Sequence, residues 1–203
     1  MIETREAWLT ELTQKLRDSF QAVDFPLPGK IRASCGFPSR GALASKKRSI
    51  GEAWADDRSE DQHYETFVSP MISDALEVAA VEVHELCHVA VGVKNGHRKP
   101  FTIVAKAMGL EGPMTATTAG EALKVKLTKL IEELGPYPHA RLVHSSGPKK
   151  QGTRMILIKC PKCEYQVRTT KKWIEVGVPT CPCGEKMKAE IPDEDDDDDD
   201  SPE

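Results

Sequence analysis

The sequence predicts an α+β protein, and three observations indicate this fold class. Apolar residues recur at helical spacing in several long segments, short β-prone segments separated by turn residues occupy residues 30–68, and two close cysteine pairs lie near the C-terminus. A chain of 203 residues suits one moderate domain and a small accessory module. We therefore expect a domain over residues 1–140, a module over 141–190 and an acidic tail over 191–203.

The first elements are a helix and a small sheet. Residues 3–20 carry apolar side chains at steps of about four with charges between them, which predicts an amphipathic helix that "DFPLPG" ends. The segments "KIRASCGF", "KRSIGEAWA" and "HYETFVS" then read as strands. Because turn residues separate them, we expect an antiparallel sheet.

A second helix is predicted from about residue 69 or 73 to residue 93. It is apolar on nearly every side, which is typical of a helix buried at the centre of a domain. The few polar residues that it carries are therefore informative. Two shorter helices follow, in "KPFTIVAKAMG" and "AGEALKVKLTKLIEELG".

The central helix contains the motif H-E-x-x-H at His84, Glu85 and His88. Residues four apart share a helix face, so the two imidazoles can bind one metal ion. Zinc lowers the pKa of a bound water to about 7, and the adjacent Glu85 can accept its proton as general base. A metal would also offset the cost of burying these polar groups in an apolar helix. This pattern predicts a catalytic zinc site.

The third zinc ligand has several candidates. The metzincin pattern requires glycine and histidine at the positions of Val91 and Lys94, so it does not apply. Glu111 would resemble the thermolysin arrangement, but it lies in "GLEGP", which reads as a loop. His97 follows the helix in a glycine-containing turn that can fold back towards His88, and we favour it. The remaining histidines, His63, His139 and His144, are expected to be surface or packing residues.

The segments "HELCHVAVG" and "NGHRKPFTIVAKAMGLEG" resemble the SprT-like (Spartan) zinc metalloprotease family. The matching residues are His84, Glu85, His88, Gly96, His97 and Phe101. The resemblance implies a zincin-like domain in which a later G-H-x-x-x-F histidine completes the zinc site. It also implies DNA-associated protein substrates, including proteins crosslinked to DNA. The interval between His88 and His97 is shorter than in the eukaryotic members.

The C-terminal cysteines predict a second, structural zinc site. Cys160 and Cys163 form C-x2-C, and Cys181 and Cys183 form C-x-C after a gap of seventeen residues. Four thiolates close a tetrahedron around zinc and leave no open position. The gap leaves room for two strands, "YQVRTT" and "WIEVG", so we expect a β-rich zinc ribbon, which SprT-like proteins often carry here. Cys35 and Cys87 are isolated, and Cys87 is expected to point into the core.

Positive charge is concentrated in the same module. Residues 141–190 hold eleven Lys or Arg against four Glu, whereas "DEDDDDDDSPE" holds nine acidic residues. Lys and Arg contacts to phosphates give sequence-independent binding, and exposed aromatic rings stack on unpaired bases. The candidate nucleic-acid-binding residues are Lys149, Lys150, Arg154, Lys159, Lys162, Arg168, Lys171, Lys172 and Trp173. The alternative is a solvated face with Trp173 packed on the ribbon core. The tail is expected to be disordered and to aid solubility or to compete with DNA for the ribbon.

These features favour a zinc-dependent endopeptidase that acts on DNA-associated or DNA-crosslinked proteins and binds DNA without sequence specificity. Two alternatives stay open: a non-catalytic zinc protein associated with DNA or transcription, and metal-assisted hydrolysis of a non-peptide bond. The charged N-terminal segment lacks an apolar stretch typical of a secretory signal, and no apolar run suits a membrane span. We therefore expect a cytoplasmic, DNA-associated protein without a membrane partner.

Overall fold

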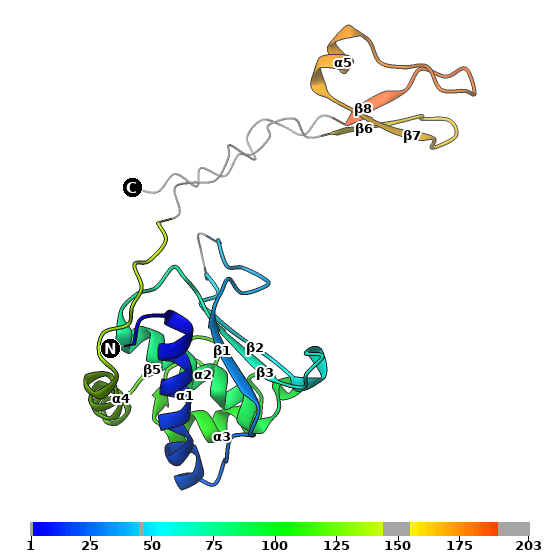
Figure 1. Cartoon of the computed structure of the whole chain (residues 1–203). Coiled ribbons are helices and arrows are strands. Elements are labelled where there is room, and N and C mark those ends of the chain that lie inside the picture. The colour runs from blue at the N-terminus through cyan, green and yellow to red at the C-terminus, as the bar shows by residue number, and fades with distance from the viewer. Residues whose placement is uncertain (1, 45–46, 144–154, 191–203) are drawn as a thin grey trace. The chain divides into compact units, whose positions relative to one another are not determined.

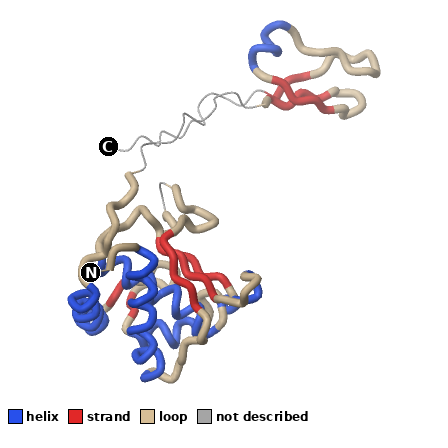
Figure 2. Tube along the Cα trace, in the orientation of Figure 1, coloured by secondary structure: helices blue, strands red, loops and turns tan. Residues whose placement is uncertain are grey.

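The structure is a computed structural model that describes residues 2–44, 47–143 and 155–190. The chain divides into two compact units, Met1–His144 and Ser145–Glu203 (Figure 1). Both contain helices and short strands (Figure 2), so the predicted α+β class is confirmed. The acidic tail lies outside the described residues, as do His144, Lys149, Lys150 and Arg154.

The sheet of the first unit contains β1 (Ile31–Cys35), β2 (Gly51–Trp54) and β3 (Tyr64–Val68) in the order β1-β3-β2. β2 pairs antiparallel with β3, as expected, but β1 runs parallel to β3, so the prediction of a wholly antiparallel sheet was wrong. β3 enters between the two earlier strands. Because β3 is the central strand, β2 is an edge strand of the sheet.

Side chains alternate between the two faces of this sheet. Gly51 lies opposite Val68, and Ala53 lies opposite Thr66, so these four residues share the face that packs on the helices. Glu52 lies opposite Phe67 and Trp54 lies opposite Glu65 on the other face, which we call the outer face. Arg32, opposite Glu65 in the parallel pair, belongs to it as well.

Four helices complete the first unit. Their bounds are α1 Arg5–Ala22, α2 Ala75–Val91, α3 Lys99–Met108 and α4 Glu121–Leu134, with short strands β4 (Leu110–Glu111) and β5 (Thr118–Ala119) and 3-10 turns at Asp56–Arg58 and Val93–Asn95. Thr4 caps α1 by accepting a hydrogen bond from the Ala7 N–H, and Asp74 caps α2 through the Glu77 N–H. Each helix begins within a few residues of its predicted position.

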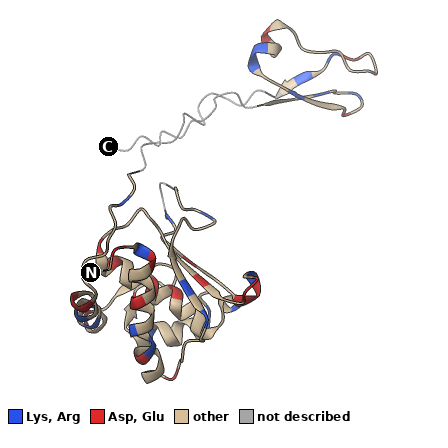
Figure 3. Cartoon of the chain, viewed as in Figure 1, with Lys and Arg blue, Asp and Glu red and all other residues tan. Residues whose placement is uncertain are grey.

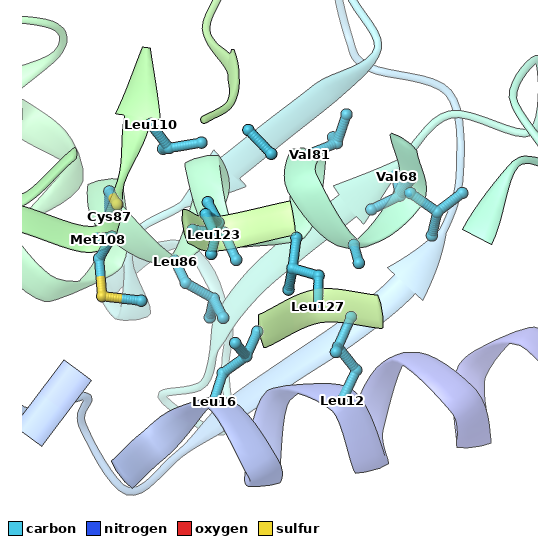
Figure 4. Close-up of a cluster of buried hydrophobic side chains, with 14 of the residues drawn as sticks. Leu12, Leu16, Val68, Val81, Leu86, Cys87, Met108, Leu110, Leu123 and Leu127 are labelled. Atoms are coloured by element: carbon cyan, nitrogen blue, oxygen red, sulfur yellow. The ribbon is translucent and has the colours of Figure 1, made fainter. Parts of the chain in front are cut away.

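The core is built around α2, as its all-round apolar sequence predicts. Leu12 and Leu16 of α1 and Leu123 and Leu127 of α4 approach Leu86 of α2 in one buried cluster (Figure 4), together with Cys87, which is fully buried as expected. Burial of each large apolar side chain contributes about 1.5–3 kcal/mol. The central helix is therefore fixed from several sides, and so are the polar groups that it carries.

The second unit contains a three-stranded antiparallel sheet with the order β7-β6-β8. Its elements are β6 Ile156–Lys159, β7 Gln166–Thr169, α5 Lys171–Val176 and β8 Lys188–Glu190. The strand expected at "WIEVG" is instead the helix α5, while β6 and β8 were not predicted. The small core of this unit consists of Ile158, Met187, Cys160 and Cys181. Within the described ranges, every helix is too short or too polar to span a lipid bilayer.

Candidate metal centres

Three imidazole rings converge at the C-terminal half of α2. The Nε2 atom of His97 lies 3.1 Å from Nε2 of His84 and 3.2 Å from Nε2 of His88. Among the described residues, these three histidines form one of two groups whose potential ligand atoms lie within 4.8 Å of one another. Glu111 is in strand β4 and belongs to neither group. The geometry thus brings together the two motif histidines and His97.

The turn after α2 brings His97 back towards the helix. Gly92 has φ +85° and Gly96 has φ +50°, backbone conformations that favour glycine. The Asn95 side-chain amide donates to the Val91 carbonyl at 2.6 Å and ties the turn to the helix end. The buried ring of Phe101 then packs against all three imidazoles, with centroid distances of 4.3 Å to His88, 4.8 Å to His84 and 4.9 Å to His97.

The donor set fits zinc. Zinc–nitrogen distances near 2.0–2.1 Å in a tetrahedron place nitrogen atoms about 3.3 Å apart, close to the spacing found here. The Nδ1 atom of His84 lies 2.8 Å from the Thr117 hydroxyl, a contact that suits a proton on Nδ1 and leaves the Nε2 lone pair free. Three facing Nε2 atoms cannot all be satisfied by one another's protons, whereas one cation satisfies all three.

The environment keeps the imidazoles neutral, which metal binding requires. Burial, with a smaller effect from His97, lowers the pKa of His84 to about 4. Burial and the neighbouring imidazoles lower the pKa of His88 to about 3, and burial also lowers the pKa of His97. The buried Nδ1 of His88 has no hydrogen-bond partner among the described residues.

Glu85 lies beside the histidines beneath strand β2. It is 6% exposed, and burial raises its pKa well above the usual value, with further contributions from the charges of Glu82 and Glu52. Glycine at position 51 makes room for it: a Cβ on Gly51 would lie 2.7 Å from Val81 Cγ1 and 3.0 Å from Glu85 Cδ. The backbone of β2 at Gly51 therefore lies directly against the Glu85 carboxylate.

These groups open into one cavity of about 360 Å³. Its lining includes Glu85 and the three clustered histidines, the β2 region from Arg48 to Ala53, and Thr115–Thr117 from the segment before β5. The carboxylate and the three imidazoles thus share one solvent-reachable space along the edge strand. Sequence reasoning did not identify Thr117 or Gly51, because neither carries a local motif.

Glu82, one turn before Glu85, is another buried acid. One of its carboxylate oxygens, Oε1, accepts hydrogen bonds from Thr13 of α1 at 3.0 Å and from Thr66 of β3 at 2.9 Å. Its second oxygen has no partner among the described residues, and burial raises the pKa of Glu82 to about 7. The sequence offered one signal, since Glu82 interrupts an otherwise apolar helix.

The four cysteines of the second unit form the other ligand group. Cys163 Sγ lies 3.4 Å from Cys181 Sγ and 3.6 Å from Cys183 Sγ, and Cys160 Sγ lies 3.6 Å from Cys183 Sγ. A tetrahedral zinc with bonds near 2.3 Å separates its sulfur atoms by about 3.75 Å, so the cluster fits zinc. The Lys162 N–H donates to Cys160 Sγ, which favours the thiolate.

The described part of the ribbon carries exposed aromatic and basic side chains. Trp173 is 57% exposed and Tyr165 is 49% exposed, so Trp173 does not pack on the small core. The Lys172 ammonium lies 5.3 Å from the centre of the Trp173 ring. Figure 3 shows Lys and Arg on α5 and on β8. Other candidate residues with described positions are Lys159, Lys162, Arg168 and Lys171.

The other described histidines lie away from both groups. His139 Nε2 donates to the Pro70 carbonyl at 2.9 Å, and His63 lies 3.1 Å from Asp61.

Comparisons of the chain with family models, curated proteins and solved structures find no match. The likeness to SprT-like metalloproteases therefore rests on the motif residues alone.

Proposed function

We propose that the protein is a zinc-dependent endopeptidase that acts on DNA-associated proteins. One observation carries the proposal: three neutral imidazoles and a buried glutamate face the same cavity along the edge strand β2. A purely structural zinc site has no use for the carboxylate, whereas hydrolysis needs a base at this position.

His84, His88 and His97 would hold the catalytic ion through their Nε2 atoms. When bound, zinc supplies Lewis acidity and lowers the pKa of a water ligand to about 7. The Thr117 hydroxyl keeps the His84 ring in the ligating orientation. The Phe101 ring, stacked on His88 and in contact with the other two imidazoles, restricts all three.

Glu85 moves the proton. Its raised pKa makes the carboxylate a stronger proton acceptor than an exposed glutamate. The carboxylate takes a proton from the attacking water and then delivers it to the nitrogen of the leaving amine. Contact with β2 at Gly51 holds the carboxylate in place during both transfers.

Strand β2 favours a peptide over other hydrolysable substrates. It is an edge strand, and its residues line the cavity beside Glu85. An extended peptide can add to such an edge by main-chain hydrogen bonding, which positions a scissile bond without demanding one side chain. The substrate class that follows is an extended segment of a protein chain.

The ribbon supports the DNA association. Exposed Trp173 and Tyr165 offer stacking surfaces, and neighbouring Lys and Arg side chains offer phosphate contacts. We expect the affinity for single-stranded DNA to fall steeply as salt rises. Trp173→Ala should weaken binding, whereas Val176→Ala, a change at another exposed α5 residue, should not.

The decisive test uses the full chain loaded with zinc. Cleavage of a basic DNA-binding protein, and of the chain itself, is measured with and without single-stranded DNA. The matched control is Glu85→Gln, which keeps the side-chain shape and the zinc ligands but removes the base. We expect DNA-stimulated cleavage that the variant lowers by about 10²- to 10⁴-fold, with zinc content unchanged.

Equal cleavage by both forms would contradict the role of Glu85. Failure of either form to cleave, with both zinc sites filled and DNA bound, would favour the alternative of a non-catalytic zinc-containing DNA-binding protein. Cleavage of model esters but not of proteins would indicate hydrolysis of a non-peptide bond.

A further inference from the structure

We propose that an aromatic and acidic pocket on the outer face of the sheet binds a cationic side chain of the protein substrate. This inference rests on the proposed function, because it concerns the substrate of the same edge strand. The pocket has a volume of about 300 Å³ and is lined by Phe37, Ser39, Glu52, Trp54, Arg58, Glu65 and Phe67.

Three aromatic rings from different strands and loops meet in this pocket. Phe67 of β3 and Trp54 of β2 lie on the same sheet face, and Phe37 follows the end of β1. The chain at Gly36 passes so close to the Phe67 ring that a Cβ there would lie 2.9 Å from Phe67 Cδ1. Phe37 is 46% exposed and Trp54 is 37% exposed, so a ligand can reach their faces.

A fixed carboxylate completes the pocket. Glu52 accepts hydrogen bonds from the Ser39 N–H at 2.8 Å and from the Ser39 hydroxyl at 2.5 Å. Although burial opposes ionisation, these bonds hold the pKa of Glu52 below its usual value, and the Trp54 side chain lowers it further. The negative charge therefore stays beside the Trp54 ring.

The charges of the lining side chains favour a cationic ligand. Two carboxylates, Glu52 and Glu65, line the pocket with one guanidinium, Arg58, whose Nε lies 3.6 Å from Asp57 Oδ1. The positive charge of Arg40 also acts on Glu52 and helps to keep it ionised. Glu65 is already paired with Arg32 at 2.6 Å. Aromatic faces beside an ionised carboxylate attract ammonium and guanidinium groups and repel phosphates. A lysine or arginine side chain fits this chemistry better than a nucleotide.

The pocket adjoins the metal cavity through Glu52, which borders both. A peptide that adds to the edge of β2 opposite β3 projects every second side chain towards the outer face. Trp54 lies three residues along β2 from Gly51, or about 10 Å. A cationic residue a few positions from the scissile bond would thus meet the pocket, which matches the basic composition expected of DNA-associated proteins.

The test measures ligand binding at the pocket itself and does not depend on catalysis. The full-length Glu85→Gln chain is labelled with 5-fluorotryptophan, and its three tryptophan signals are assigned by single Trp→Phe variants. The probes are a capped peptide of three Ala-Arg repeats and its counterpart with citrulline, a neutral isostere of arginine. Their binding is followed by ¹⁹F NMR.

We expect the arginine peptide to shift the Trp54 signal saturably and the citrulline peptide to shift it weakly. Phe37→Leu and Glu52→Gln should each raise the dissociation constant read at Trp54 by about threefold to thirtyfold. The Trp8 signal reports whether these variants stay folded. Binding of the peptide to the acidic tail does not interfere, because the signal is local to Trp54.

An unchanged Trp54 signal at saturating arginine peptide would overturn the proposal. Equal shifts with the citrulline peptide would reduce the pocket to an uncharged contact surface, and a shift with single-stranded DNA alone would assign it to nucleic acid. A binding result stands whether or not the protein cleaves peptides, so it separates this inference from the proposed function.

Discussion

Gly51→Ala is expected to disturb the site while leaving the fold in place. The added methyl would lie 2.7 Å from Val81 Cγ1 and 3.0 Å from Glu85 Cδ, and it would overlap Glu85 Oε1. Neither neighbour is free to retreat, because Glu85 is 6% exposed and Val81 is 9% exposed on a helix fixed by the core. Either the carboxylate rotates or the edge strand moves away.

The size of the effect follows from these contacts. Overpacking by one methyl costs about 1–3 kcal/mol, which lowers the Tm of the first unit by roughly 3–10 °C. A displaced base also slows catalysis, and we expect kcat to fall by about 10²-fold with a smaller change in KM.

The matched control is Gly29→Ala. A Cβ at Gly29 meets nothing within 4 Å, and its backbone is not in the left-handed region. Thermal unfolding and cleavage are measured for both zinc-loaded variants. If Gly51→Ala keeps both the wild-type Tm and the wild-type kcat, the close approach of β2 to Glu85 is refuted.

Three further predictions concern other buried or ligating groups. Thr117→Val removes the acceptor of the His84 Nδ1 proton, so zinc affinity at the histidine site should fall about 10- to 100-fold in chelator competition, and an unchanged affinity would exclude this role. Burial raises the pKa of Glu82 to about 7, so ionisation of this carboxyl destabilises the folded state. The loss of stability is absent below the unfolded pKa of 4.5, grows as pH rises and is complete above pH 7. Glu82→Gln should therefore gain stability over wild type between pH 5 and pH 8 in denaturant titrations, by up to about 3 kcal/mol, and a pH-independent difference would disprove it. Cys163→Ser should reduce the zinc content from two ions per chain to one and unfold the ribbon while His-site zinc remains, as metal analysis and circular dichroism would show.

Local sequence patterns predicted the features that depend on residues close together in the sequence. The helix at 75–91 follows from its apolar periodicity, and the clustering of the three histidines follows from i,i+4 spacing and a glycine turn. Strand direction does not follow from such patterns, because β-prone residues indicate a strand without naming its partner. β1 therefore proved parallel to β3, contrary to expectation.

The remaining misses have a related cause. "WIEVG" contains β-branched residues, yet it forms a helix in which Ile174 packs against the small core while Trp173 and Val176 face solvent. The nearby residues 188–190 supply the third strand instead. Thr117 and Gly51 act on the site only through tertiary contacts, so no motif at either position could reveal them.

All three candidate imidazole ligands lie within fourteen consecutive residues, and Phe101 follows four positions later. Closing this site requires one helix end and one turn, whereas closing the cysteine site requires a loop of seventeen residues and a sheet. Contacts between near neighbours in sequence form early in folding because little chain entropy is lost. Bringing the three histidines together therefore costs less chain entropy than bringing the four cysteines together, and we expect the histidine cluster to form first.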